Sequence, residues 1–175
     1  MATDNPSDAQ ATMTQLRIDS LDNRDAELAA AINRLQLAAY RQEGDLLGIR
    51  DFPPLRENIR DVQLSSAAFF GAFMDEQLAG ILCTEPRDGD IRITSLTVAP
   101  EHQRQGIARA LVCHVARTFS CQRLYVSTSS RNVPGIALYR VLGFVAYQQR
   151  HAGPERVEIT DFSIDRSQLL QPQTA

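Results

Sequence analysis

The hydrophobic pattern of the chain changes period at Gly106, and this change limits the folds that are open to it. Residues 91–98 have the pattern of a strand. Between 107 and 119, apolar residues recur every three to four positions, as they do on one face of a helix. Residues 123–127 again read as a strand. A helix between two strands makes a crossover connection, which predicts that 91–98 and 123–127 pair in parallel.

The remaining segments predict a sheet that is otherwise antiparallel. Short connections join the predicted strands 67–74, 77–84 and 91–98, with a loop at 85–90. The other expected elements are a strand at 15–19, a helix from Asp22-Asn23 to Glu43-Gly44, a helix at 55–64, a helix from Asn132 to Leu142-Gly143, and a hairpin of 144–149 with 156–164. We therefore predict an α/β (α+β) fold, with a mixed, mostly antiparallel sheet of six to seven strands and helices on both faces.

The predicted strand 91–98 changes its apolar face part-way along. Ile91 and Ile93 lie on one face by alternation, whereas Leu96 and Val98 lie on the other. One extra residue would restore a single buried face, which predicts a β-bulge at residues 94–95. A strand that is buried on both faces explains the same pattern equally well.

The length of 175 residues predicts one domain, which we place at 13–165. The polar segment 1–12 is expected to be disordered, and 166–175 to be a flexible tail. The N-terminus has no secretory pattern, and no apolar run approaches the roughly 18 residues of a membrane helix. We therefore expect a cytoplasmic protein that does not contact a membrane.

Charge and composition exclude several classes of function. The formal net charge is −3 and no basic cluster stands out, which argues against nucleic-acid binding. All 18 basic residues are arginines, so chemistry that needs a lysine, such as a Schiff base or a P-loop, is excluded. The three cysteines and three histidines lack metal-ligand spacing, so we expect no metal.

The loop before the second half of the chain has the features of an anion site. The first amides of a helix that opens at Gly106 have no intrahelical partner and lie at the positive end of its dipole. Gly106 and Ala108 would let a ligand approach the backbone, and Arg104 and Arg109 add positive charge. A diphosphate would suit this site. A plain tight turn between strand and helix is the alternative.

Two motifs resemble those of the GNAT superfamily of N-acetyltransferases. The first is Gln103-x-x-Gly106-x-Ala108 after Leu96-Thr97-Val98-Ala99-Pro100-Glu101, and the second is Asn132-x-x-x-x-Ala137-Leu138-Tyr139-x-x-x-Gly143-Phe144. They occur in the family's order, and the resemblance covers about 13–165. Tyr40-x-x-Glu43-x-x-Leu46-Leu47-Gly48 and Phe52-Pro53-Pro54-Leu55 are similar to an uncharacterised bacterial branch of the family.

The resemblance implies that acetyl-CoA is the co-substrate and that 91–98 and 123–128 splay apart to admit its pantetheine arm. The implied activity is direct transfer of the acetyl group to a primary amine of a small molecule or peptide, within a ternary complex. The residues implied to bind the co-substrate are Leu96, Thr97, Val98, Gln103, Arg104, Gln105, Gly106, Ile107, Ala108, Arg109, Asn132 and Tyr139.

The resemblance also implies catalytic roles for Val98 and Tyr139. The Val98 N–H would stabilise the oxyanion, and the Tyr139 phenol would protonate the leaving thiolate. The alternative for Tyr139 is a purely structural aromatic residue. One branch of the family carries a glutamate five residues before the asparagine; here that residue is Ser127, and 91–98 has no carboxylate. The remaining candidates for the base are Glu43, Asp45, Glu158, and water held by Ser95, Thr97 and Ser127.

The acceptor wall is predicted to consist of Tyr40, Glu43, Asp45, Pro53 and Ser127. Glu43 would lie in the last turn of its helix, where the dipole disfavours a carboxylate, and this suggests a functional reason for its presence. An acidic wall would suit a cationic amine. The missing strand carboxylates favour an alternative, a catalytically weak acyl-CoA-binding sensor or interaction module. The sequence leaves open whether two copies form a homodimer.

Overall fold

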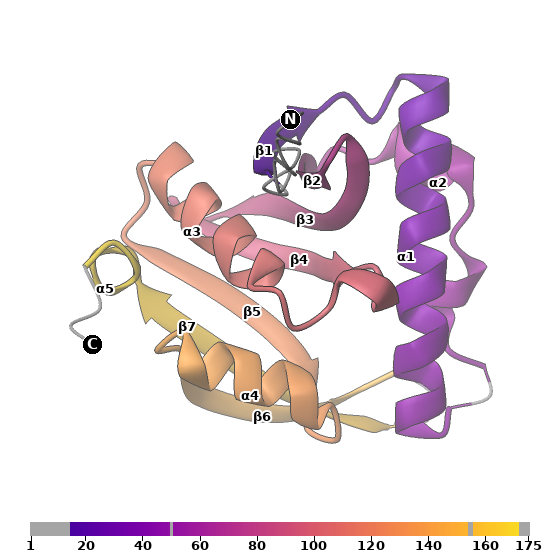
Figure 1. Ribbon diagram of the computed structural model, residues 1–175. Helices are drawn as coiled ribbons and strands as arrows, with labels where there is room; N and C mark the ends of the chain where they lie inside the picture. The colour runs from indigo at the N-terminus through magenta and orange to yellow at the C-terminus, as the bar shows by residue number, and fades with distance from the viewer. Residues whose placement is uncertain (1–14, 50, 154–155, 172–175) are drawn as a thin grey trace, which may run out of the picture.

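The computed structural model describes residues 15–49, 51–153 and 156–171 as one sheet with helices packed on it (Figure 1). The predicted disordered segment 1–12 lies outside these residues. The elements are β1 (Leu16–Leu21), α1 (Ala26–Leu47), the 3-10 helix η1 (Pro53–Arg56), α2 (Ile59–Leu64), β2 (Ala68–Met74), β3 (Gln77–Arg87), β4 (Asp90–Val98), the 3-10 helix η2 (Pro100–His102), α3 (Ile107–Thr118), β5 (Arg123–Ser129), α4 (Val133–Val141), β6 (Val145–Ala152), β7 (Val157–Asp165) and α5 (Arg166–Leu169).

The sheet has seven strands in the order β1-β2-β3-β4-β5-β7-β6. Only β4 and β5 pair in parallel, and the other neighbouring strands of this sheet are antiparallel. This confirms the predicted fold class. None of the described helices is both long and apolar enough to cross a membrane.

Two apolar cores fill the opposite faces of the sheet. Alternate strand residues such as Phe69 and Phe70 face opposite ways, as the twofold period of a strand requires. The core that contains Phe69 also receives Ile32 of α1 and Val62 of α2. The core that contains Phe70 receives residues of α3, α4 and α5. Figure 1 accordingly shows α1 and α2 side by side, apart from α3 and α4.

The predicted bulge in β4 is present. Cys83 of β3 pairs with Ser95, and the next residue, Thr84, pairs with Ile93, so Thr94 is the extra residue. Ile91 and Ile93 before the bulge contact the same core as Leu96 and Val98 after it. The alternative of a strand that is buried on both faces is therefore wrong, because the bulge brings both pairs to one face.

The parallel ladder between β4 and β5 is short. It runs from Ile91 opposite Leu124 to Ile93 opposite Val126 and stops at the bulge. Beyond that point the strands diverge, which confirms the expected splay. The second half of β4 therefore keeps β3 on one edge, and no strand of the described residues pairs with its other edge.

The predicted loop at 85–90 is wrong. β3 continues to Arg87, and Asp88 and Gly89 form a two-residue turn in which both φ angles are positive. Pro86 is tolerated in the strand because β2 ends opposite Thr84, so the missing N–H of the proline costs no ladder hydrogen bond.

The predicted end of α1 at Glu43-Gly44 is also wrong. The helix begins at Ala26, after the cap Asp25, whose carboxylate accepts the Leu28 N–H, and it continues to Leu47. Gly48, at φ 67°, forms the left-handed cap. Gly44 lies inside the helix because the Phe52 side chain packs against its backbone, with 3.4 Å between the Phe52 Cβ and the position that a Gly44 Cβ would take.

The expected flexible tail at 166–175 is wrong for its first residues. Arg166–Leu169 form α5, Leu169 is buried in the core with α3, and the Arg166 Nε donates a hydrogen bond to the Ala116 carbonyl. Two adjacent leucines, Leu169 and Leu170, in an otherwise polar segment give too weak a pattern to reveal this packing. Residues 172–175 lie outside the described part of the chain.

Gly80 controls how closely α3 approaches the sheet. A Cβ at this position would lie 2.8 Å from the Ile107 Cγ2, so we expect Gly80→Ala to destabilise the fold by about 1–3 kcal/mol. Ile107→Leu removes that Cγ2, so the double variant should be more stable than the sum of the two single changes predicts. Chemical denaturation measures the coupling, and additive effects would contradict the contact.

Gly44→Ala is the matched control for this experiment. The new Cβ would make only ordinary contacts with Phe52, and alanine favours a helix, so stability should rise by about 0.5–1 kcal/mol.

Candidate active site

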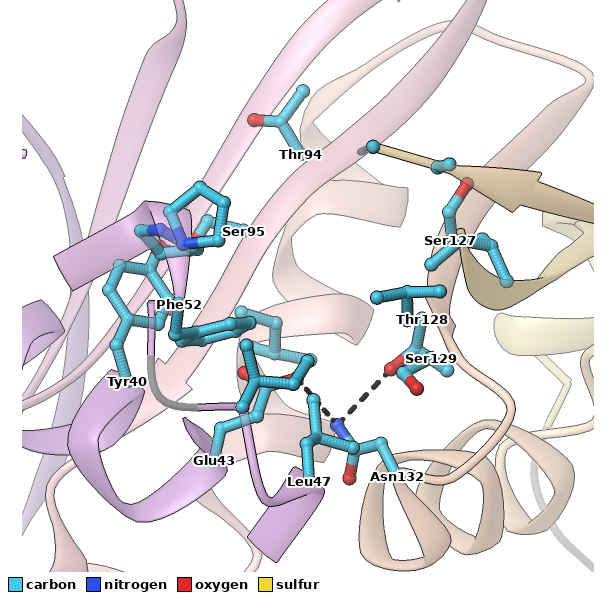
Figure 2. A pocket seen from close by; sticks show the side chains of 18 of the residues that line it. Tyr40, Glu43, Leu47, Phe52, Thr94, Ser95, Ser127, Thr128, Ser129 and Asn132 are labelled. Carbon is cyan, nitrogen blue, oxygen red and sulfur yellow. Dashed lines mark hydrogen bonds between the residues drawn. The ribbon is translucent and has the colours of Figure 1, made fainter. Parts of the chain in front are cut away.

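A cleft of about 580 Å³ opens where β4 and β5 diverge (Figure 2). Its walls come from the C-terminal half of α1, the segment 51–57 with η1, the bulge of β4, the end of β5, the start of α4, and the ends of β6 and β7. Figure 2 shows Tyr40, Glu43 and Phe52 on one side and Ser127 and Thr128 of β5 on the other. The volume is typical of a small-molecule site.

The free edge of β4 presents backbone groups along the cleft. The Ala99 N–H donates to the Ala79 carbonyl, so it points toward β3. Successive strand N–H groups point to opposite edges, so the Val98 and Leu96 N–H groups point toward the side that β5 has left. Leu96 itself lines the cleft, and Thr97 and Val98 continue the edge toward α3. The Thr97 hydroxyl is buried without a hydrogen-bond partner among the described residues.

The loop after β4 leads to the N-terminus of α3. Gly106 caps the helix at φ 80°, and nothing lies within 4 Å of the position its Cβ would take. The first helical hydrogen bond is donated by the Ala110 N–H to the Gly106 carbonyl, so the amides of Ile107, Ala108 and Arg109 have no acceptor in the helix. Arg104, Gln105 and Arg109 are exposed around this end.

The Gln103 side chain joins this loop to α1 and to the end of β4 by hydrogen bonds. Its Nε2 donates to the Gln42 Oε1 of α1 at 2.7 Å and to the Val98 carbonyl at 3.3 Å. The structure therefore gives the Gln103 side chain a role in fixing the loop, while its backbone stays at the anion-binding end. No group of His, Cys, Asp and Glu side chains that could hold a metal ion occurs among the described residues.

The α1 wall of the cleft carries Tyr40, Glu43 and Pro53, as expected. The Tyr40 and Ser95 hydroxyls are hydrogen-bonded at 2.9 Å, which ties α1 to the bulge, and burial raises the pKa of Tyr40. The Phe52 ring meets the Tyr40 ring edge to face at 6.3 Å.

Two predicted acids do not belong to the cleft. Asp45 is exposed and does not line it, because α1 continues past Glu43 as a helix and two residues later faces the opposite side. Its predicted place in the acceptor wall is wrong. Glu158, a candidate for the base, also points to solvent from β7 and does not line the cleft.

Glu43 and Asn132 join α1 to α4 across the cleft. The Asn132 Nδ2 donates to the Glu43 Oε1 at 3.0 Å and to the Thr128 Oγ1 at 3.1 Å, and the Asn132 Oδ1 accepts the Gly135 N–H as the α4 cap (Figure 2). Both amide hydrogens of Asn132 are thus already used. Burial raises the pKa of Glu43, and the Asn132 hydrogen bond only partly opposes this. Glu43 lies a full turn before the end of α1, so its predicted place in the last turn is wrong.

Tyr139 of α4 is buried and is one of the residues that line the cleft. Its ring is buried against Phe144 and Phe162, at centroid distances of 5.6 and 5.8 Å. Burial is the main cause that raises the pKa of Tyr139, and the charge of Glu43 raises it further, so the phenol stays protonated. The structural and catalytic interpretations of Tyr139 therefore both have support, because the side chain packs in the core and also lines the cleft.

Ser127 lines the cleft from the sheet side and is bound to a carboxylate that the sequence analysis missed. Its Oγ donates to the Asp161 Oδ1 at 2.5 Å, and Arg150 in turn donates to both oxygens of Asp161. Asp161 stands in a predicted strand, but which strand it would face depends on the sheet order. No local signal shows that β7 lies beside β5.

Comparison with known proteins places this geometry in a family. The sequence model of the acetyltransferase (GNAT) family matches residues 30–144. The chain belongs to this family. The UPF0157 protein YqkA of Bacillus subtilis (strain 168) is 31% identical over 128 residues, which are 73% of this chain. The match spans only 37% of the length of that relative.

Solved structures share the fold of this GNAT protein at low sequence identity. The ribosomal-protein-S18-alanine N-acetyltransferase from Escherichia coli superposes with a TM-score of 0.67 at 19% identity, and the match covers 92% of this chain and 99% of the other. YncA from Salmonella typhimurium, solved with acetyl-CoA, gives a TM-score of 0.63 at 17% identity and covers 91% and 99%. The overall fold of the chain is therefore shared with solved acetyltransferase structures.

The raised pKa of Glu43 predicts how stability changes with pH. The unfolded chain loses this proton at lower pH than the folded chain, so folding stability falls as pH rises from the ordinary glutamate range through the raised pKa. Glu43→Gln keeps an acceptor for Asn132 but has no such proton. We expect its stability relative to the native chain to increase across this window, as measured by denaturant unfolding at several pH values.

Glu158→Gln, which makes the same chemical change on the exposed side of β7, corrects for the loss of one negative charge. If the stability of the native chain instead grew relative to Glu43→Gln with rising pH, the Asn132 hydrogen bond would outweigh burial at Glu43.

Proposed function

We propose that the protein is an N-acetyltransferase that transfers the acetyl group of acetyl-CoA directly to a primary amine of a small molecule or peptide. The observation that carries the proposal is the free edge of β4, which runs from the cleft to the amides at the start of α3. A co-substrate with an extended amide-containing arm and a diphosphate matches both ends of this edge. The acetyl-CoA bound to YncA supports the choice of co-substrate.

Two parts of the site would bind acetyl-CoA: the backbone edge of β4 and the loop at the start of α3. The edge of Leu96, Thr97 and Val98 would pair with the pantetheine arm as an added strand. The amides from Gly106 to Arg109 and the Arg104 and Arg109 side chains would bind the phosphates. The Asn132 side chain could donate to the pantetheine arm only by breaking its hydrogen bond to Glu43 or to Thr128, since both of its amide hydrogens are used.

Glu43 is the base of the proposed reaction. It lines the cleft, one of its oxygens is held by Asn132, and the raised pKa of its carboxylate brings it nearer to that of a useful proton acceptor. It would take a proton from the bound ammonium, and the free amine would then attack the thioester carbon. The Val98 N–H would stabilise the oxyanion. As the carbon–sulfur bond breaks, the Tyr139 phenol would give its proton to the thiolate, and the surplus proton on the new amide nitrogen would then return to the Tyr139 phenolate.

The second candidate function is a catalytically weak acyl-CoA-binding module. One observation favours it, because the carboxylates among the cleft-lining residues are Glu43, Asp51 and Glu57, and none of them is on β4 or β5. Release of free CoA from acetyl-CoA with a panel of n-butylamine, ethanolamine, 1,4-diaminobutane and alanine amide separates the two. An enzyme releases CoA faster with at least one amine than without any, whereas a binding module does not.

Acetyl-CoA should stabilise the fold through the Gly106 loop. At a hundredfold excess over its dissociation constant it should add about 2.7 kcal/mol, seen as a rise in Tm. Gly106→Val should lose most of this rise, because its side chain would fill the open space at the start of α3 and strain the backbone at φ 80°. Gly89→Val, with φ 85° and equally open space in the β3–β4 turn, is the matched control and should keep the rise. Equal shifts in both variants would refute the loop as the binding site.

Tyr139→Phe tests the proposed acid. The change keeps the ring against Phe144 and Phe162, so Tm and acetyl-CoA affinity should change little. Turnover of the best amine in the panel should fall by about 10²–10⁴-fold, equally in kcat and in kcat/KM. Steady-state kinetics with single-turnover controls measure this. An unchanged chemical step would remove Tyr139 from the mechanism and leave it a core residue.

A further inference from the structure

We propose that Asp161 and Arg150, which do not line the cleft, position Ser127 so that its oxygen accepts a hydrogen bond from the acceptor amine. This inference rests on the proposed function. It gives the sheet wall of the cleft a group opposite Glu43 that selects acceptors with an N–H donor. Ser127 would contact the amine, and Asp161 and Arg150 would act only through it.

The direction of the Ser127 hydrogen bond carries the argument. A hydroxyl has one hydrogen and two lone pairs, and a carboxylate can only accept. The short 2.5 Å contact to the Asp161 Oδ1 therefore directs the Ser127 hydrogen away from the cleft. Ser127 is exposed and lines the cleft, so the lone pairs of its oxygen remain available there. Toward a ligand in the cleft, the Ser127 oxygen can therefore accept a hydrogen bond but not donate one.

Arg150 keeps Asp161 in its charged form. Asp161 is only 4% exposed, and burial by itself would raise its pKa. The hydrogen bonds from Arg150, with its Nε at 2.8 Å and its Nη2 at 3.2 Å, and the one from Ser127 outweigh burial and lower the pKa. A charged Asp161 cannot donate to Ser127. Arg150 thus determines which way the serine proton points.

One further charged side chain, Arg87 of β3, acts on the Asp161 carboxylate. Arg87 of β3 also lowers the pKa of Asp161, while its own guanidinium stacks on the Tyr125 ring at 4.0 Å and donates to the Tyr147 hydroxyl. Among the described residues, the charged groups that lower the pKa of Asp161 are Arg150 on β6 and Arg87 on β3. Both are arginines and stay charged at any working pH, so the serine keeps its direction throughout.

A bound ammonium has three N–H donors, so in this proposal it would donate one hydrogen bond to Glu43 and another to Ser127. Glu43 lies on the α1 wall and Ser127 on the sheet wall of the same cleft (Figure 2). An alcohol or thiol acceptor has one hydrogen to donate and could not serve both walls. No proton is transferred through Ser127 in this scheme, because the lowered pKa makes Asp161 a poor proton acceptor.

The experiment measures KM and kcat for the panel amine with the highest kcat/KM in the native protein. Ser127→Ala should raise KM about ten- to hundredfold, as expected for a lost hydrogen bond to a charged group, with kcat within about twofold. Ser163→Ala is the matched control. Ser163 lies on β7, on the same face of the sheet as Asp161, and does not line the cleft.

Arg150→Gln tests the positioning role. Without the guanidinium, burial should raise the pKa of Asp161, which ¹³C NMR of the Asp161 carboxyl carbon follows directly without any amine. As Asp161 becomes protonated it can donate to Ser127 and turn the serine proton toward the cleft. The KM of this variant, relative to the native protein, should therefore rise as pH falls. Arg150→Lys should restore most of the native value.

Arg123→Gln is the matched control for the arginine. Arg123 pairs with Asp165 across β5 and β7 with the same Nε geometry at 2.8 Å, remote from the cleft, and should leave the pH profile of KM unchanged. In the Ser127→Ala background, Arg150→Gln should have no further effect on KM. Tm of each variant separates these effects from a loss of folding.

The outcomes distinguish this inference from the proposed function. Turnover of no amine in the panel would overturn the proposed function, and the inference with it. Turnover with an unchanged KM in Ser127→Ala would overturn the inference alone. An Asp161 carbon that titrates near neutral pH in the native protein, or an Arg150→Gln effect that persists without Ser127, would also overturn it.

Discussion

The extra residue at Thr94 is the feature on which the rest of the structure depends. A strand has a period of two, so one inserted residue exchanges the faces of everything that follows. Because of it, Leu96 and Val98 share a core with Ile91 and Ile93. The same residue marks the point where β5 leaves β4, so core packing and the cleft have one origin.

The bulge also determines what faces α1. Ser95 is turned toward the helix and is hydrogen-bonded to Tyr40, which fixes the α1 wall of the cleft relative to β4. On the other side, Asn132 caps α4 and at the same time holds Glu43 of α1. The two walls of the cleft are thus joined to each other by polar contacts at the bulge and at the α4 cap. Any ligand that takes the Asn132 amide must replace a hydrogen bond that now joins α1 and α4.

The fold could be predicted from the sequence because its main features are local. The phase slip in β4 and the change of period at Gly106 are visible in short windows. The errors arose where distant residues decide the outcome: Gly44 stays helical because Phe52 packs on it, and Leu169 is ordered because the core receives it. Within the site, Tyr40, Glu43 and Tyr139 were predicted to line the cleft, as they do, whereas Asp161 was missed because only the sheet order brings β7 beside β5.

Glu43, which lines the cleft, and Asp161, which lies beside it, show how burial and pairing shift the pKa of a carboxylate in opposite directions. Glu43 is held by a neutral amide alone, so burial dominates, its pKa rises, and it can accept a proton. Asp161 is also shielded from solvent, but it is hydrogen-bonded to the Arg150 guanidinium, so its pKa falls and it accepts the Ser127 hydrogen bond as a carboxylate. Exchanging these surroundings would exchange the roles. In the proposed reaction, the position of Arg150, more than that of either acid, would therefore account for a proton acceptor on the helix and not on the sheet.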